Sequence, residues 1–172
     1  TPMLIFSSTW RNCFNGMHNL HFTMVPQQFN RLLEFTKHND DYNRKISSVL
    51  IGGDLLSSDL RHSITRLPYD VYYGYGSTET CAQVTGLVLN DDFQSVGYAL
   101  DGVNLKSIDG CLAIQSSSLF KGYVTNKGVE LPDLTNGYFV SSDLVTIDEN
   151  GLIYIDGRRD FQFNSGGSLI SP

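Results

Sequence analysis

The sequence predicts an α/β fold, with a mainly parallel sheet and flanking helices followed by a small β-barrel-like subdomain. In the first half, short apolar runs alternate with helical patterns over short connections, which is the order that builds parallel sheets from βαβ units. In the second half, short strands follow one another without helices, as in small antiparallel barrels. We therefore predict an α/β lobe over residues 1–90 and a β-rich subdomain over residues 91–172.

The first half is predicted to hold strands joined by amphipathic helices. Short apolar runs predict the strands Met3–Phe6, His21–Val25, Ser48–Ile51 and Asp70–Tyr73. Between them, apolar residues recur at helical spacing over residues 10–17, 29–36 and 60–67. Ser8 is a suitable N-cap for the first helix, and Pro26 suits the first turn of the second. These alternations are what a parallel sheet requires.

The second half carries two hairpin signals. Asp109-Gly110 separates two alternating runs, 103–108 and 111–115, and this dipeptide favours a tight turn. The runs 144–147 and 152–155 flank a longer loop that contains Gly151. Further strands are expected over residues 84–89 and 138–140. Strands this closely spaced indicate an antiparallel sheet.

Composition excludes several classes of protein. The chain has 172 residues, 41% of them hydrophobic, which is enough for a packed core. Its net charge of −6 without a basic cluster argues against nucleic-acid binding, and no apolar run reaches the ~18 residues of a membrane span. The three cysteines and four histidines show no zinc spacing. Sparse cysteines favour a reducing, cytoplasmic location.

A glycine-rich segment follows the strand that ends at Tyr73. Residues 74–80 read Gly-Tyr-Gly-Ser-Thr-Glu-Thr, which fits neither the dinucleotide fingerprint nor the P-loop. Such a turn can still bring backbone N–H groups close to a phosphate. Thr78 would add a hydroxyl donor, and Glu79 a hard oxygen ligand for Mg²⁺. An ordinary turn before a helix explains the segment about equally well.

Two more places carry polar groups at strand ends. Gly52-Gly53-Asp54 ends a strand at the sheet edge where open α/β sheets bind ligands, although a structural turn is an equal alternative. Asp143 opens one strand of the second predicted hairpin, and Gly157-Arg158 closes the other. Antiparallel pairing would bring them together, either as a salt bridge or as a pair that holds ribose hydroxyls.

These segments together resemble the adenylate-forming (AMP-binding) superfamily of acyl-CoA synthetases, adenylation domains and luciferases. The YGSTE of residues 75–79 is similar to the family's YGxTE motif, and residues 49–54 to the strand and turn before it. Four further segments match in order and approximate spacing: 95–97, 110–123, 137–143 and 148–158. The resemblance extends from about residue 20 to residue 172.

The resemblance implies a role for each matching position. Tyr75, within the Tyr75-Gly76 step, would stack on adenine, and Gly53 with Asp54 would line the adenine and acyl pocket. Thr78 would contact the α-phosphate. Glu79 would bind Mg²⁺, Asp143 and Arg158 would hold the ribose, and Asp160 would be the hinge to a C-terminal lid. Those residues, in chain order, are Gly53, Asp54, Tyr75, Gly76, Thr78, Glu79, Asp143, Arg158 and Asp160.

The implied activity is ATP-dependent ligation of a carboxylic acid to CoA through an acyl-adenylate, with ATP, Mg²⁺ and CoA as cofactor and co-substrates. Compact linkers and residues 157–167 are most similar to the o-succinylbenzoate–CoA ligases of menaquinone synthesis. Fatty acyl- and aryl-CoA synthetases are the alternatives. A non-catalytic α/β binding module is a third interpretation, from another class.

Some family features differ or lie outside these residues. Ser142 and Phe161 replace the usual Gly and Asp, and Ile155 stands where many members carry an aromatic residue. The family's phosphate loop would precede residue 1, and the lid with its catalytic lysine would follow residue 172. We therefore expect the missing parts of the same protein to be partners of this chain, which alone would be inactive. Self-association into a homo-oligomer stays open.

Overall fold

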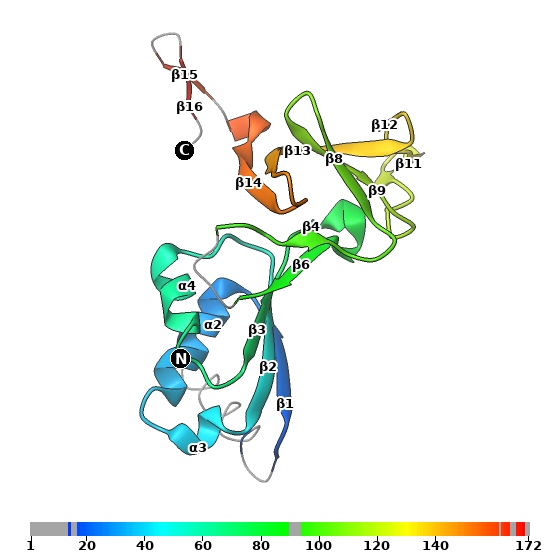
Figure 1. Cartoon of the computed structure of the whole chain (residues 1–172). Helices are drawn as coiled ribbons and strands as arrows, with labels where there is room; N and C mark the ends of the chain where they lie inside the picture. The colour runs from blue at the N-terminus through cyan, green and yellow to red at the C-terminus, as the bar shows by residue number, and fades with distance from the viewer. Residues whose placement is uncertain (1–13, 15–16, 90–93, 162, 166–167, 171–172) are drawn as a thin grey trace. The chain divides into compact units, whose positions relative to one another are not determined.

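The computed structural model describes residues 14, 17–89, 94–161, 163–165 and 168–170, and it confirms the α/β fold class (Figure 1). The described chain divides into two compact units. Unit 1 comprises residues 1–74 and 88–94, and unit 2 comprises residues 75–87 and 95–172. The boundary predicted at residue 90 stays a prediction. The strand expected at Met3–Phe6 and most of the helix expected over residues 10–17 lie outside the described residues.

Unit 1 contains a parallel sheet in the order β1-β2-β3. Its strands are β1 (Leu20–Met24), β2 (Ile46–Ile51) and β3 (Asp70–Tyr73). The register places Phe22 opposite Val49 and Val49 opposite Val71. The helix α2 (Pro26–Thr36) follows β1, and α3 (Asp40–Asn43) and α4 (Ser58–Ile64) complete the unit. In Figure 1, α2 and α4 lie on the same side of this sheet.

The core of unit 1 lies between this sheet and its helices. Phe29 and Leu32, which share one face of α2, are fully buried, as are Val49 and Ile51 of β2. The spacing of three residues between Phe29 and Leu32 is the helical period that the sequence predicts. Burying each such side chain stabilises the fold by about 1.5–3 kcal/mol. Helix α4 ends at Ile64, earlier than the predicted pattern to residue 67.

Unit 2 is dominated by an antiparallel sheet in the order β12-β13-β9-β8, with β14 paired to β13. Its strands are β8 (Asn104–Ile108), β9 (Cys111–Gln115), β12 (Leu134–Thr135), β13 (Tyr138–Ile147) and β14 (Ile153–Arg158). Smaller elements are β4 (Gly76–Ser77), β5 (Ala82–Gln83), β6 (Thr85–Val88), β7 (Tyr98–Ala99), β10 (Tyr123–Thr125), β11 (Gly128–Glu130), β15 (Phe163–Ser165) and β16 (Ser168–Ile170). The 3₁₀ turns η1 (Thr78–Thr80) and η2 (Arg159–Phe161) adjoin β4 and β14.

Both predicted hairpins of unit 2 are present. Asp109 and Gly110 join β8 to β9 with φ values of 50° and 78°. Positive φ at both central residues is the feature of the tight turn that Asp-Gly favours. In the second hairpin, the Asp148 carboxylate accepts hydrogen bonds from the N–H groups of Asn150 (2.9 Å) and Leu152 (2.8 Å). Local turn chemistry therefore sets both connections.

Among the described residues, no helix has the length and apolar character needed to cross a membrane. Within the same residues, no group of three or more His, Cys, Asp or Glu side chains is arranged to hold a metal ion. Cys81 and Cys111 are both free thiols.

Candidate nucleotide site

The glycine-rich segment forms a tight hairpin in unit 2. β4 and β5 pair antiparallel around η1, with Gly76 opposite Gln83 and Ser77 opposite Ala82. The buried Thr80 hydroxyl closes the turn, because it accepts from the Ser77 N–H (2.9 Å) and lies 2.6 Å from the Ala82 carbonyl oxygen. The alternative predicted an ordinary turn followed by a helix. The turn is present, but the helix is not, because the strand β5 follows the 3₁₀ turn.

Gly76 is required where the two short strands approach each other. A Cβ atom at this position would lie 2.1 Å from the carbonyl oxygen of Ala82 and 2.7 Å from the Cα atom of Gln83. Both contacts are with backbone atoms, so no side-chain rotation relieves them. Glycine at this position thus allows the two strands of the hairpin to pack closely. Its contact with a nucleotide stays a prediction.

The backbone of Tyr75 is fixed by Thr85. The Tyr75 N–H donates to the Thr85 hydroxyl (2.9 Å), and that hydroxyl donates to the Val96 carbonyl (2.6 Å). The Tyr75 carbonyl accepts from the N–H groups of Val84 (2.8 Å) and Thr85 (3.2 Å). Thr85 is fully buried. Sequence reasoning missed Thr85, because its partners are ten and eleven residues away and no motif marks it.

Tyr75 and Asp143 meet through their side chains. The Tyr75 hydroxyl donates a hydrogen bond to Oδ2 of Asp143, a residue that is only 9% exposed. Burial raises the pKa of Tyr75, and the hydrogen bond to Asp143 with its negative charge raises it further. Tyr75 is therefore held at two points, through its backbone by hydrogen bonds and through its side-chain hydroxyl by Asp143.

Asp143 and Arg158 are cross-strand partners on β13 and β14. Nη1 of Arg158 lies 3.9 Å from Oδ1 of Asp143. The pairing skips one residue of β14, Asp156, between Leu144–Gly157 and Val145–Ile155, which is a β-bulge. Bulges bend a strand and re-aim the side chains beyond them. The two residues that sequence analysis singled out are thus brought together.

Arg158 also forms a two-point contact with Asp160. Its Nε and Nη2 atoms donate to the two carboxylate oxygens of Asp160 at 2.9 and 2.7 Å. These hydrogen bonds lower the pKa of Asp160 and raise that of Arg158. Asp160, the predicted hinge residue, is therefore tied directly to the predicted ribose-binding arginine.

Glu79 lies at the centre of the η1 turn, half-buried, while Thr78 beside it is exposed. Oε1 of Glu79 accepts a hydrogen bond from the Tyr123 hydroxyl (2.9 Å). Partial burial raises the pKa of Glu79, but the hydrogen bond from Tyr123 and the charge of Arg158 contribute to lowering it overall. Glu79 is therefore an ionised carboxylate at neutral pH, which is the form that binds cations.

Gly53 and Asp54 belong to unit 1, where they form the turn after β2. Gly53 has a φ of 83°, and the Asp54 carboxylate accepts from the Leu55 N–H (2.8 Å). The Tyr73 hydroxyl donates to the Asp54 carbonyl (3.3 Å). Their convergence with the residues of unit 2 stays a prediction.

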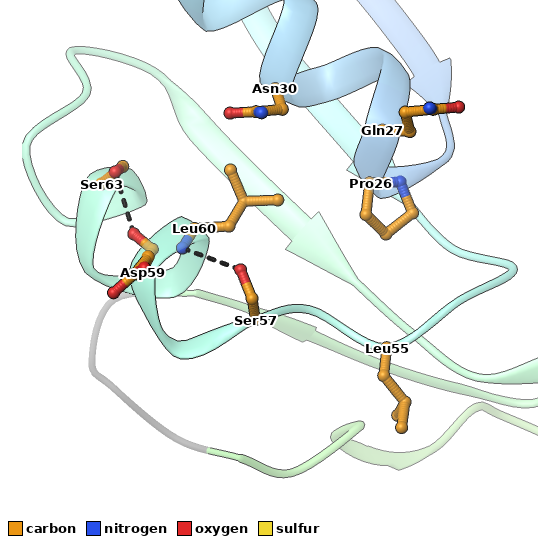
Figure 2. Close-up of a pocket in the computed structure, with 8 residues that line it drawn as sticks. All are labelled: Pro26, Gln27, Asn30, Leu55, Ser57, Asp59, Leu60 and Ser63. Carbon is orange, nitrogen blue, oxygen red and sulfur yellow. Dashed lines mark hydrogen bonds between the residues drawn. The ribbon is translucent and has the colours of Figure 1, made fainter.

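A separate pocket of about 440 Å³ lies between α2 and α4 of unit 1 (Figure 2). It is lined by Pro26, Gln27, Asn30, Leu55, Ser57, Asp59, Leu60 and Ser63. The Ser57 hydroxyl accepts from the Leu60 N–H (3.3 Å), and the Ser63 hydroxyl donates to the Asp59 carbonyl (2.9 Å), as Figure 2 shows. Both hydroxyls thus serve α4 itself, and none of the sequence-predicted site residues lines this pocket.

Comparison with known proteins identifies the family. Residues 7–124 match the family described as "AMP-binding enzyme". The chain belongs to this family, as its motifs predict. It is 32% identical over 165 residues to a 2-succinylbenzoate–CoA ligase of Staphylococcus aureus, an alignment that covers 88% of the chain and 32% of the relative. A ligase of the same name from Haemophilus influenzae is 28% identical over 152 residues, covering 88% of the chain and 33% of the relative.

Solved structures show the same relationship. Wild-type E. coli MenE, bound to an analogue of OSB-AMS, is 27% identical, with a TM-score of 0.78 over 94% of this chain and 34% of that one. The o-succinylbenzoate coenzyme A synthetase of Bacillus subtilis, in complex with ATP and magnesium ion, is 23% identical with a TM-score of 0.79, over 96% of this chain and 37% of that one. At 23% identity, the similarity to the Bacillus subtilis structure shows a shared fold. The chain spans about a third of the length of the curated relatives it matches.

Proposed function

We propose that this chain is part of an ATP-dependent acid–CoA ligase that acts on o-succinylbenzoate in menaquinone biosynthesis, in the cytoplasm. The observation that carries the proposal is the linked set of Tyr75, Asp143 and Arg158, at the positions where the family binds adenine and ribose. Membership of the AMP-binding family and the names of the relatives support the ligase activity and the choice of acid.

In this proposal, the adenosine of ATP binds against Tyr75 in unit 2. The hydrogen bond to Asp143 holds the Tyr75 ring, on which adenine stacks. Oδ2 of Asp143 is engaged by Tyr75, and Oδ1, which lies 3.9 Å from Nη1 of Arg158, would accept from a ribose hydroxyl. Gly53 and Asp54 would complete the adenine and acyl pocket.

The residues present fit a magnesium ion that is bound together with nucleotide phosphates. Mg²⁺ commonly takes one or two protein carboxylates plus phosphate oxygens and waters. Glu79 is an ionised, half-buried carboxylate, and the described residues contain no larger acidic cluster that would form a complete protein site. Glu79 would hold the ion, and Thr78 would contact the α-phosphate. The bound ion would neutralise charge on the phosphates.

The chemistry proceeds in two displacements. A carboxylate oxygen of the acid bonds to the α-phosphorus of ATP as the bond to pyrophosphate breaks, which gives the acyl-adenylate. Donors such as the Thr78 hydroxyl stabilise the charge that develops on the phosphate oxygens. The thiolate of CoA then bonds to the acyl carbon as AMP leaves. Asp160 would be the hinge for the lid that serves both steps, and the lid and phosphate loop would come from other parts of the same protein.

The test is ATP–pyrophosphate exchange by the whole protein with o-succinylbenzoate, fatty acids and benzoate as candidate acids. We expect exchange that depends on o-succinylbenzoate and falls at least about a hundredfold in Glu79→Gln, since a metal ligand contributes several kcal/mol to the transition state. Glu149→Gln, at an exposed glutamate of the β13–β14 loop, is the matched control and should exchange normally. Exchange at the wild-type rate in Glu79→Gln would contradict the assignment.

A further inference from the structure

Tyr123, the first residue of β10, contacts Glu79 from 44 residues further along the chain. Its hydroxyl donates to Oε1 of Glu79 at 2.9 Å. The backbone makes a second link, because the N–H of Phe120 donates to the Glu79 carbonyl at 2.8 Å. The segment that leads into β10 is therefore joined to the η1 turn at both the main chain and the side chain of Glu79.

The position of the Tyr123 ring is fixed by aromatic packing. Phe120 meets it edge to face, with ring centroids 4.7 Å apart, and meets Phe139 of β13 in the same way at 5.6 Å. Edge-to-face pairs of this kind stabilise a defined ring orientation. Through Phe120 and Phe139, the Tyr123 ring therefore packs towards the sheet of unit 2, and this packing orients its hydroxyl towards Glu79.

A carboxylate that accepts one hydrogen bond keeps capacity to bind a cation, because its two oxygens offer about four lone-pair sites. Glutamate side chains are flexible, and holding one in a single orientation lowers the entropy lost when it takes up a ligand. Hydrogen bonds to ligating carboxylates orient them for metal binding in this way. Arg158 is the charged residue that acts on Glu79 from β14.

We infer that Tyr123 is a positioning residue, which orients the Glu79 carboxylate for the magnesium ion that accompanies ATP. The inference rests on the proposed function, because it assumes that Glu79 binds the metal. If Tyr123 had only a structural role, its ring would be the important part; in the inferred role, its hydroxyl is the group that affects metal binding. The aromatic ring, which packs on Phe120, is not the group that acts on Glu79.

The test is Tyr123→Phe in the whole protein, with Mn²⁺ as the probe and binding followed by electron paramagnetic resonance in the presence of ATP. We expect Mn²⁺ affinity to fall about tenfold, as is typical when a hydrogen bond to a metal ligand is lost. The affinity for AMP without metal and the thermal midpoint should not change. Tyr98→Phe is the matched control, because Tyr98 is 48% exposed against 47% for Tyr123 and its hydroxyl has no partner among the described residues.

Three results separate the possibilities. An unchanged or higher Mn²⁺ affinity in Tyr123→Phe, while Glu79→Gln binds weakly, would overturn the inference and leave the proposed function standing. Normal Mn²⁺ affinity in Glu79→Gln would contradict the proposed metal-binding role of Glu79, and with it the inference about Tyr123. A loss in Tyr123→Phe that is matched in Tyr98→Phe would also overturn the inference, because it would show that tyrosine hydroxyls act non-specifically.

Discussion

Replacing Thr85 by valine tests the hydrogen-bonded support beneath Tyr75. The side chains have nearly the same shape, so the change removes the hydroxyl without opening a cavity. In the wild type this hydroxyl accepts from the Tyr75 N–H at 2.9 Å and donates to the Val96 carbonyl at 2.6 Å, at a position with no solvent exposure. The substitution therefore leaves one backbone donor and one backbone acceptor without their partner.

The expected loss follows from these two groups. An unsatisfied buried polar group costs about 1–3 kcal/mol. Val96 is almost fully buried, whereas Tyr75 is half-buried and water can reach it more easily. We therefore expect the free energy of unfolding to fall by about 2–4 kcal/mol. Thr85→Ser keeps the hydroxyl and removes one methyl group, which should cost about 1 kcal/mol.

Urea denaturation of the three proteins measures these differences, and hydrogen exchange at the Tyr75 and Val84 amides shows whether the loss is local to unit 2. We expect the order wild type, Thr85→Ser, Thr85→Val from most to least stable, with faster exchange at Tyr75 in the valine variant. A Thr85→Val protein as stable as Thr85→Ser would refute the reasoning, because the buried hydroxyl would then carry no net stabilisation.

Two further substitutions have defined outcomes. Gly76→Ala should lower the free energy of unfolding by more than about 2 kcal/mol, because its Cβ would clash with the Ala82 carbonyl oxygen. Gly110→Ala, which has open space at a φ of 78°, should cost only about 1 kcal/mol in strain, and equal losses in urea denaturation would contradict the clash. Arg158→Ala should raise the pKa of Asp160 towards its ordinary value in a carboxyl NMR titration. Because that pKa is lowered in the folded wild type, the ionised Asp160 carboxylate stabilises the folded protein at higher pH. This contribution to the free energy of unfolding is lost as pH falls through the folded-state pKa, and the variant should not show that pH-dependent decrease. An Asp160 pKa that does not change would show that the contact is absent in solution.

Features that depend on neighbouring residues could be predicted from the sequence. The strand Asp70–Tyr73 has the predicted bounds, and the Asp109-Gly110 turn joins two strands as expected. Turn residues set their own backbone angles, so a dipeptide carries the information. The pairing of Asp143 with Arg158 could also be predicted, because the two strands of a hairpin are neighbours in the sheet.

Features that depend on distant partners could not be predicted in this way. The sequence suggests two short strands over residues 138–140 and 144–147, whereas the structure has one strand, Tyr138–Ile147. Its middle residues, Ser141 and Ser142, show no apolar alternation, and the pairing with β9 shifts register between Val140 and Leu144. The strand continues because β9 pairs with residues on both sides of this shift and β14 pairs from Asp143 onwards. Thr85 and Tyr123 were missed for a similar reason, since each acts on a residue that the chain brings close only after folding.

The contacts of Arg158 connect the two roles proposed at the end of β14. Its guanidinium is bonded at two points to Asp160 and lies farther from Asp143, at 3.9 Å. The pair with Asp160 is solvent-exposed, and exposed ion pairs contribute little net stability. A ribose bound at Asp143 could therefore draw the guanidinium away from Asp160 at small cost. If Asp160 is the hinge and Arg158 holds the ribose, as we propose, the same arginine contacts both the nucleotide and the hinge residue. Nucleotide binding and hinge movement would then be coupled through one side chain, without any further contact.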